Sequence, residues 1–432
     1  MNDLLFRGAR VLDTAGGRDE TADVLVHDGA IAGVNGRLST DGAEVLDSDG
    51  LVLAPGLVDL HTHLREPGDD HKETIESGTR AAAVGGFTAV APMANTDPVA
   101  DSAAVVHEVR DLAARAGFAD VFPVGAISKG LEGEILAEIG EMVGAGVRMF
   151  SDDGRCVPTS RVLRNALTYA KAFESVVIAE HCEDPSLSEG GHMHEGYHSY
   201  SLGLRGQPAE TEEVIVARDL ALARLTGGRL HLCHLSSARS VELVGRAKAE
   251  GVRVTAEVTP HHLTFTDEDL ASYDTNLKVN PPLRSSDDRD ALRVGLARGE
   301  IDVVATDHAP HAVEEKEAEF DRSPPGTIGL ETALPAVLTG LVEPGLMTLH
   351  RAVEAMSTIP ARILRATGHG GPIEPGSPAN IVVFDPAASF RVEPPFASKS
   401  RNSAFIGMTL RGKVVYTLLR GELTVADGKA VR

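Results

Sequence analysis

Residues 56–63 read GLVDLHTH, an apolar run that ends in two histidines, His61 and His63. Seven further apolar runs follow along the middle of the chain, each leading into polar residues. They read FTAVAPMANT (87–96), ADVFPVGAI (119–127), GVRMFSDDG (146–154), SVVIAEHCED (175–184), RLHLCHLSS (229–237), VRVTAEVTPHH (252–262) and IDVVATDHAPH (301–311). Segments of helical period separate them, which is typical of strands and helices that alternate around a parallel sheet. Eight such units predict an α/β fold of the closed (β/α)8 TIM-type barrel kind.

The two ends of the chain have a different pattern. Before residue 56, short apolar runs alternate with turn signals, and Asp28-Gly29 has the composition of a hairpin turn. ANIVVFDP (379–386) and the strand-like runs after it behave in the same way. We therefore expect a barrel over residues 56–365 and a small β-sandwich domain built from both termini, residues 1–55 and 366–432.

The composition of the 432-residue chain argues against several classes of protein. A net charge of -22 opposes binding to nucleic acid, whose phosphates carry the same sign. No apolar run approaches the ~20 residues of a membrane span, and the chain opens without a signal-peptide pattern. Three cysteines without CxxC spacing are typical of a reducing compartment. We expect a cytoplasmic protein that binds neither nucleic acid nor membranes.

Unusual polar residues fall where the predicted strands end. In a parallel barrel, functional groups gather at the carboxyl ends of the strands. The residues at these positions are His61, His63, Asn95, Asp152, Asp153, His181, His234 and Asp307. Four histidines and two of the carboxylates at one rim match the ligand set of a zinc-type site that holds one or two ions, with two favoured.

Each of these residues also has an ordinary explanation when it is taken alone. An isolated HxH is more often a chance pair in a polar loop, and a lone strand-end histidine such as His181 is more often hydrogen-bonded than a ligand. The DDG stretch at 152–154 has the composition of a turn. The shared position at strand ends favours the metal site, because His61 and His63 leave the same face of a strand and can hold one ion.

Strand alternation guides the remaining choices at the rim. Only one aspartate of the DDG stretch can face the barrel mouth. His234 is preferred to His231, which lies earlier on the strand and faces the other way. Cys182 and Cys233, each next to a favoured histidine, should point away from the site toward the packing between barrel and helices. The roles of His261 and His262, and of the HMHEGYH loop at 192–198, stay open.

Arg65 and Asn95 are expected beside the metal without binding it. A guanidinium is a fork-shaped donor suited to a carboxylate, and an asparagine amide adds further donors. A surface salt bridge is the ordinary alternative for Arg65, but its position two residues beyond the HxH pair favours an anionic substrate. His311 would add a third contact. Two cations at such a site activate water and polarise a carbonyl, which indicates hydrolysis of an amide-like or ester-like bond, or the reverse.

These residues stand in segments that together resemble the dihydroorotases of the cyclic amidohydrolase superfamily. The segments are DLHTHLREPG, MANTDP, FSDDG, EHCED, HLCHLS, VTPHHL, NPPLR, TDHAPH and PPGTIGLE, between about residues 55 and 331, and GSPANIVVFDP in the tail. The pattern resembles the bacterial class in which an aspartate replaces a carboxylated lysine as the metal bridge. DxHxH alone indicates only the superfamily, whereas the joint pattern is specific.

The resemblance implies a zinc-dependent enzyme that reversibly cyclises N-carbamoyl-L-aspartate to L-dihydroorotate plus water, in the de novo synthesis of UMP. It implies that a metal-activated hydroxide is the nucleophile and that Asp307 is the general acid/base. The implied metal ligands are His61, His63, Asp153, His181, His234 and Asp307. The implied contacts to the substrate carboxylate are Arg65, Asn95 and His311, and those to the pyrimidine ring are Asn280, Pro325 and Gly326. A homo-oligomer and a complex with aspartate transcarbamoylase are implied as partners.

Two residues depart from the family pattern. Ala94 stands where the family usually has proline in MPNT, which removes no donor. Arg148 lies near the position where related hydantoinases carry the carboxylated lysine, and a guanidinium forms no such carbamate, so Asp153 is favoured as the bridge. The alternatives are a hydantoinase or allantoinase that opens cyclic ureides, and an inactive homologue that scaffolds aspartate transcarbamoylase.

Overall fold

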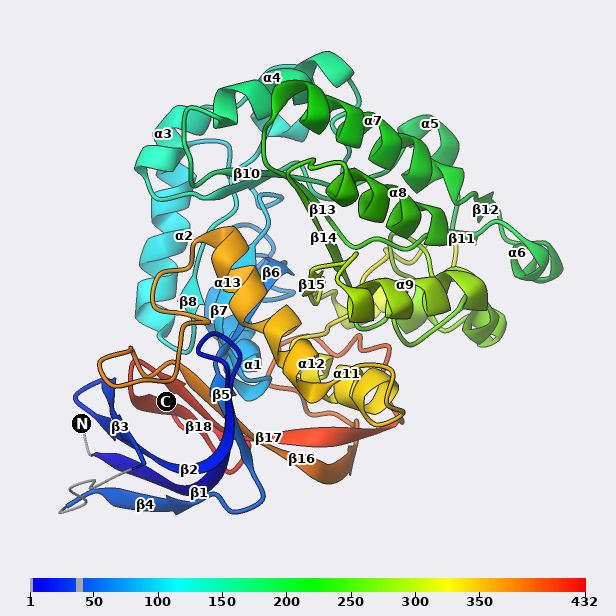
Figure 1. Ribbon diagram of the computed structural model, residues 1–432. Coiled ribbons are helices and arrows are strands. Elements are labelled where there is room, and N and C mark those ends of the chain that lie inside the picture. The colour runs from blue at the N-terminus through cyan, green and yellow to red at the C-terminus, as the bar shows by residue number, and fades with distance from the viewer. Residues whose placement is uncertain (1–2, 36–41) are drawn as a thin grey trace.

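Eight short parallel strands form a barrel in the order of the chain (Figure 1). They are β6 (Leu57–Thr62), β7 (Phe87–Pro92), β8 (Asp120–Val121), β9 (Met149–Ser151), β10 (Val177–Glu180), β13 (Leu230–Leu232), β14 (Val254–Val258) and β15 (Val303–Val304). The computed structural model describes residues 3–35 and 42–432. A strand has formed in each of the eight apolar runs, so the predicted barrel is confirmed.

The barrel is closed by contacts between two groups of hydrogen-bonded strands. One group runs β6-β7-β8 and the other β9-β10-β13-β14-β15. Parallel bridges join Gly125 to Phe150 and Thr62 to His308, one at each seam. At the second seam the carboxylate of Asp59 accepts hydrogen bonds from the backbone N–H and the hydroxyl of Thr306, at 3.0 and 2.5 Å. Burial raises the pKa of Asp59 to about 7.

Helices follow the strands and cover the barrel (Figure 1). They are α1 (Ile75–Val84), α2 (Ala103–Ala116), α3 (Ile139–Gly144), α4 (Ser160–Ala170), α5 (Pro185–Ser188), α6 (Tyr197–Leu202), α7 (Glu210–Thr226), α8 (Ala238–Ala249), α9 (Ser286–Arg298), α10 (Val313–Lys316), α11 (Ala333–Val337), α12 (Leu349–Met356) and α13 (Thr358–Leu364). Ser237 caps α8 by accepting a hydrogen bond from the backbone of Arg239, and Gly227 ends α7 in the left-handed conformation. Within the described ranges, no helix is long and apolar enough to cross a membrane.

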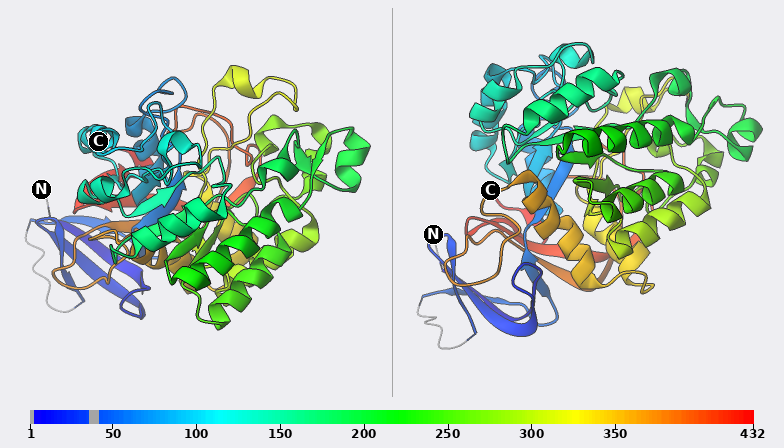
Figure 2. Two further views of the ribbon diagram at one scale, coloured as in Figure 1. Left: turned by 90° about the horizontal axis from the view of Figure 1, so that it is seen from above. Right: turned by 45° about the horizontal axis from the view of Figure 1, so that its top comes forward.

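Both termini build one large sheet beside the barrel (Figures 1 and 2). Its strand order is β19-β18-β17-β16-β5-β1-β2-β3, and β4 pairs with β1. The bounds are β1 (Leu4–Asp13), β2 (Arg18–His27), β3 (Ala30–Val34), β4 (Glu44–Asp47), β5 (Val52–Pro55), β16 (Ile381–Arg391), β17 (Thr409–Leu419), β18 (Glu422–Ala426) and β19 (Lys429–Ala430). A separate short pair, β11 (Met193–His194) and β12 (Gly206–Gln207), lies outside it.

The core of the terminal sheet joins the two ends of the chain. Phe6 and Val24 from the first strands share one buried cluster with Val383 and Leu418 from the last ones, as the layers of a sandwich do. β5 lies at the centre, parallel to β1 and antiparallel to β16. The predicted hairpin at Asp28-Gly29 is confirmed, since β2 and β3 are antiparallel and both turn residues have positive φ, 48° and 79°.

One expectation about the cysteines is wrong. Cys182 does pack in the cluster between barrel and helices, which also contains Leu220 of α7. Cys233, however, lies in the cluster of strand side chains that includes Val58 and Met149. The reason is the backbone of His234, where φ is 30°. This turn breaks the strand alternation, so that Cys233 and His234 do not face opposite sides.

Leu53→Ala tests the joint between the two ends. The Leu53 side chain is fully buried in β5, and its loss should lower the free energy of unfolding by about 2–5 kcal/mol, measured by denaturant or thermal unfolding. Val45→Ala is the matched control, because Val45 is 42% exposed and should change stability by less than about 0.5 kcal/mol. Equal effects of the two substitutions would contradict the assigned role of β5.

Candidate metal centre

The six residues expected to bind metal lie together at the carboxyl ends of five barrel strands. They are His61 and His63 at the end of β6, Asp153 after β9, His181 after β10, His234 after β13 and Asp307 after β15. All six are buried. Because the strands of a barrel end at one rim, residues separated by up to about 250 positions converge on a single small volume.

Asp153 lies at the centre of this cluster. Its Oδ1 atom is 3.3 Å from His61 Nε2, 3.4 Å from His234 Nε2 and 3.6 Å from His181 Nδ1. Its Oδ2 atom is 3.4 Å from His63 Nε2. The two oxygens of one carboxylate therefore face different histidines, which is the arrangement that a bridge between two cations requires.

Asp307 completes the other side of the cluster. Its Oδ1 atom is 3.1 Å from His63 Nε2 and 3.5 Å from His61 Nε2. The donor atoms of His61, His63 and Asp307 form one group that could hold an ion, and those of His61, Asp153 and His234 form another. His61 thus takes part in both groups.

The donor atoms fit a cation better than they fit one another. His61 Nε2 and Asp153 Oδ1 are buried and have no hydrogen-bond partner in the described part of the chain. Two atoms that each lie about 2.1 Å from one tetrahedral ion are roughly 3.4 Å apart. The spacings around Asp153, 3.3–3.6 Å, match that value. Imidazole nitrogens with carboxylate oxygens are also a donor set that zinc prefers.

The electrostatics of the cluster also favour positive charge. Burial opposes ionisation of Asp153, but the nearby imidazoles of His61, His181 and His234 outweigh this and hold the pKa of Asp153 well below its usual range. Burial likewise lowers the pKa of His181, and Asp153 and Glu183 reverse the effect and raise it to about 10. Proteins neutralise such groups with protons or with metal ions, so a bound cation would displace protons from these rings.

Asp152, the other aspartate of the pair, is directed elsewhere. Its Oδ1 accepts hydrogen bonds from the backbone N–H groups of Ile127 and Ser128, at 2.8 and 2.9 Å, and its Oδ2 accepts one from the Ser128 hydroxyl. It fastens the segment after β8 to the end of β9. The neighbouring acids therefore have separate tasks, and the turn explanation applies to Asp152 alone.

Glu257 is a residue that the sequence analysis missed. Its Oε1 atom accepts a hydrogen bond from His61 Nδ1 at 2.6 Å, and its Oε2 atom accepts one from His231 Nε2 at 2.9 Å. Burial opposes ionisation, but His61 and His231 lower the pKa of Glu257 to about 2. A carboxylate in this position fixes the His61 ring so that Nε2 faces the cluster. The available signal was a charged residue within the buried strand VTAEV.

Cys233 lies beneath the same histidine. Its Sγ atom, a His61 ring nitrogen and a Glu257 oxygen lie within 4.8 Å of one another. Burial raises the pKa of the Cys233 thiol above its usual range. The thiol is therefore protonated here and fills space below the ring.

Arg65 and His311 lie beside the cluster on the side of Asp307. Arg65 Nε donates a hydrogen bond to the backbone carbonyl of Pro310 at 3.1 Å, next to His311. Burial, and then the positive charge of Arg65, lower the pKa of His311 to about 3. Asn95 accepts a hydrogen bond from His63 Nδ1 at 3.0 Å. Asn95 thus contacts a histidine of the cluster, and Arg65 and His311 lie close to each other beside Asp307.

The residues expected to contact the pyrimidine ring occupy two places. Asn280 Nδ2 donates to Glu183 at 2.6 Å and lies 3.4 Å from His181 Nε2. Pro325 accepts a hydrogen bond from His311 Nε2 at 2.9 Å. Gly326 has a φ of 140°, and a Cβ atom there would be 2.9 Å from His311 Nε2, so only glycine fits.

His261, His262 and Arg148 lie in three different surroundings. His261 lies near Asp307, His234 and His61, and burial lowers its pKa to about 4. His262 is held by Thr259 and by the carbonyl of Pro281, at 2.7 and 2.9 Å, which is a structural role. Arg148 precedes β9, at the end of the strand opposite to Asp153. It donates to the carbonyl of Val147 at 2.9 Å, away from the metal cluster.

Comparison with known proteins gives a consistent family. A family model described as dihydro-orotase-like matches residues 50–240. The dihydroorotase of Streptomyces coelicolor is 52% identical over 432 residues, 99% of this chain and 100% of that one. The dihydroorotase of Mycobacterium tuberculosis is 50% identical over 431 residues, 99% of each chain.

Solved structures extend the likeness to hydantoinases and dihydropyrimidinases. The L-hydantoinase (dihydropyrimidinase) from Arthrobacter aurescens superposes with a TM-score of 0.87 at 28% identity, covering 100% of this chain and 98% of that one. The dihydropyrimidinase from Brevibacillus agri superposes with a TM-score of 0.86 at 25% identity, covering 99% and 96%. The barrel and its terminal sheet are therefore shared with these enzymes.

Glu257→Gln tests the support of His61. The substitution keeps the shape of the side chain but weakens the acceptor for His61 Nδ1, and zinc affinity should fall about 10–100-fold. Competition with a chromophoric chelator measures this affinity. Glu242→Gln on α8 is the control, because that side chain is 67% exposed. Unchanged affinity in Glu257→Gln would show that the ring is held by other contacts.

Proposed function

The chain belongs to the dihydroorotase family, and we propose that it interconverts N-carbamoyl-L-aspartate and L-dihydroorotate in pyrimidine biosynthesis. The observation that carries this proposal is that three polar residues lie beside the cluster formed by histidines and Asp153: Asn95 bonds to His63, Arg65 lies near Asp307, and His311 lies near Arg65. Dihydroorotate combines a cyclic amide with a carboxylate, and this site offers groups suited to each.

We propose that His61, His63, Asp153, His181, His234 and Asp307 hold one or two zinc ions, with Asp153 between them. Bound zinc would polarise the ring carbonyl and activate water at neutral pH. The metal itself follows from the family and from the unpartnered donor atoms, whereas the identity of the ion and the number of ions are part of the proposal.

Asp307 has the position and charge of a general acid/base. Burial opposes its ionisation, but His61 and His63 outweigh burial and keep its pKa below the usual range. The carboxylate is therefore ionised and able to accept a proton. In ring opening, Asp307 takes a proton from the attacking water and returns it to the departing ring nitrogen. In cyclisation the same proton moves in the opposite direction.

The other contacts orient the substrate. Arg65 and Asn95 would provide N–H donors for the carboxylate, and His311 lies next to Arg65. Asn280 and the backbone around Pro325 and Gly326 would contact the ring on its other edges. Fixing the carboxylate places the scissile amide at the metal cluster, and such positioning accounts for a large part of enzymatic rate enhancement.

Hydantoinase activity is the second candidate, because the solved structures with a similar fold carry that name. Two features count against it. The residue at the centre of the cluster is Asp153, and Arg148 lies at the opposite end of β9 from Asp153. In addition, neutral ureides offer no carboxylate to Arg65. The inactive-scaffold alternative predicts lost ligands, whereas all six donor residues are in place.

The substrate assay distinguishes these candidates. Purified zinc-loaded protein should turn over L-dihydroorotate and N-carbamoyl-L-aspartate, and it should act far more slowly on hydantoin and allantoin. Ultraviolet absorbance of the ring amide follows the reaction in both directions. Turnover of hydantoin or allantoin alone would contradict the proposal, and zinc-bound protein without any turnover would favour the scaffold.

Arg65→Met tests carboxylate recognition. Removing a charged hydrogen bond of about 1.5–3 kcal/mol should raise KM for dihydroorotate roughly 10–100-fold while zinc content is unchanged. Steady-state kinetics and metal analysis give the two readouts. Arg239→Met, at a side chain that is 52% exposed on α8, is the control. Loss of zinc in Arg65→Met would mean that Arg65 supports the metal cluster instead.

The domain division at residues 1–55, 56–365 and 366–432, the homo-oligomer and the complex with aspartate transcarbamoylase stay predictions. Of the first range, residues 1–2 and 36–41 lie outside the described structure.

A further inference from the structure

The C-terminal part of the chain brings a buried asparagine, Asn402, to the residues that follow β15. Asn402 lies in the segment between β16 and β17, two strands of the terminal sheet, and is 4% exposed. Its Oδ1 atom accepts a hydrogen bond from the backbone N–H of His311 at 3.1 Å. Its Nδ2 atom donates to the carbonyl oxygens of Ala309 and Gly326, at 3.0 and 3.1 Å. This one amide therefore links two loops that both hold expected substrate contacts.

The bonds to Ala309 and His311 lie on either side of Pro310. A proline has no N–H, so this stretch cannot be held by a regular ladder of backbone hydrogen bonds. The carbonyl of Pro310 and the N–H of His311 belong to one planar peptide group. Arg65 Nε donates to that carbonyl at 3.1 Å, and Asn402 accepts from that N–H. Arg65 and Asn402 thus hold the two ends of the same peptide group.

Asn402 is itself held firmly by its main chain. Its carbonyl accepts hydrogen bonds from the backbone N–H of Ile328 at 2.9 Å and from the hydroxyl of Thr327 at 3.0 Å. A few residues earlier, the backbone N–H of Lys399 donates to Glu73 at 3.1 Å. The segment is therefore fastened on both sides of the barrel loop that it supports, and the amide has a fixed position.

The loop at Gly326 is connected to His311 by two routes. His311 Nε2 donates to the carbonyl of Pro325 at 2.9 Å, and Asn402 joins the Gly326 carbonyl to the His311 backbone. Lys316 Nζ donates to the same Gly326 carbonyl at 3.0 Å. With two donors on one carbonyl oxygen, both lone pairs of Gly326 are used within the protein. The Gly326 carbonyl therefore serves to fix the loop.

We propose that Asn402 is a positioning residue for recognition of the substrate carboxylate. It fixes the peptide group between Pro310 and His311, and through that peptide group it directs the guanidinium of Arg65. This inference rests on the proposed function. It makes the terminal domain a participant in substrate recognition, although all six proposed metal ligands come from the barrel.

Asn402→Ala tests the proposal by steady-state kinetics of the zinc-loaded protein on L-dihydroorotate. KM should rise about tenfold, because the Arg65 donor is no longer held in line, whereas kcat should stay within about twofold. Zinc content should be unchanged. Asn402→Asp is the second variant, and it keeps the size of the side chain and the acceptor for His311. It loses the donor to Ala309 and Gly326, so its KM should rise as well.

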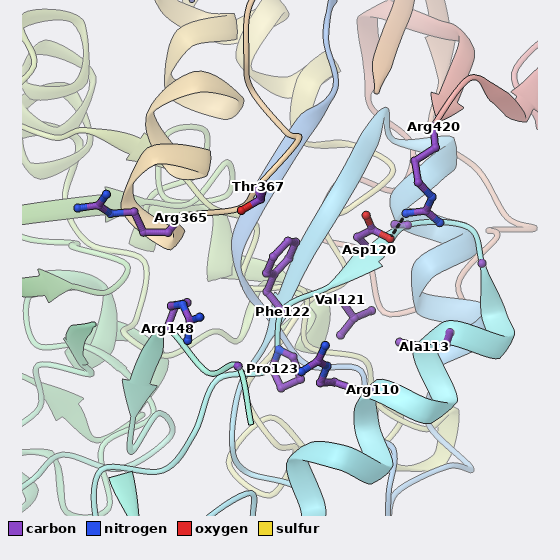
Figure 3. Close-up of a pocket in the computed structure, with 14 residues that line it drawn as sticks. Arg110, Ala113, Asp120, Val121, Phe122, Pro123, Arg148, Arg365, Thr367 and Arg420 are labelled. Atoms are coloured by element: carbon purple, nitrogen blue, oxygen red, sulfur yellow. Dashed lines mark hydrogen bonds and ion pairs between the residues drawn. The ribbon is translucent and has the colours of Figure 1, made fainter. Parts of the chain in front are cut away.

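Asn380→Ala is the matched control for a purely structural effect. Asn380 is also buried, accepts a hydrogen bond from the backbone N–H of Arg420 at 2.6 Å and donates to the carbonyl of Gly368 at 2.9 Å. Arg420 lines a pocket at the end of the barrel opposite to the metal cluster, together with other arginines and Asp120 (Figure 3). Asn380→Ala should lower the unfolding temperature and leave KM unchanged.

The double variant Arg65→Met/Asn402→Ala shows whether Asn402 acts through Arg65. Its KM should be well below the product of the two single effects, since a missing guanidinium cannot be misplaced further. Effects that multiply, an unchanged KM in Asn402→Ala and Asn402→Asp, or an equal rise in Asn380→Ala would each overturn this inference alone. Unmodified zinc-loaded protein that does not turn over dihydroorotate would overturn the proposed function and this inference with it.

Discussion

The buried negative charge of Asp153 is the constraint on which the site depends. A carboxylate removed from water costs several kcal/mol unless positive charge and hydrogen bonds surround it. Here four histidines from three separate strands supply that environment, with atoms 3.3–3.6 Å away. The barrel makes this possible because it brings strand ends to one rim. Glu257 then fixes the orientation of His61, and Asp152 fastens the segment after β8 to the end of β9.

Much of the fold could be predicted because its signals are local. Apolar runs of strand length and helical intervals are visible in the sequence, and the rim residues follow from the rule that functional groups lie at strand ends. Which partners meet across the barrel is not local. Glu257 contacts His61 from 196 positions away, and nothing near either residue indicates the pair. The expectation for Cys233 is wrong because strand alternation does not continue through His234, where the backbone turns.

The two ends of β9 illustrate how one strand serves two environments. Arg148 precedes the strand and Asp153 follows it, so that opposite charges lie at opposite ends of the barrel. At the rim, imidazoles and carboxylates favour a cation. At the other end, arginines outnumber the carboxylate Asp120. Between them the barrel contains a buried apolar cluster that includes Met149 and Val177.

The backbone gives independent support for the metal centre. Ten residues other than glycine have positive φ in the described ranges, a conformation that costs free energy and persists only where the surroundings enforce it. Arg65, His234 and Asp307 are among them at the metal centre. Arg365 is the left-handed C-cap of α13, and Arg420 lies in the turn between β17 and β18. Three of the ten positions thus carry a side chain at the metal centre. Ordinary turns explain others, such as Asp28 in its hairpin, but no hairpin contains His234 or Asp307. Their backbone turns at the ends of β13 and β15 direct the side chains into the cluster, where straight strands would have directed them along alternating faces.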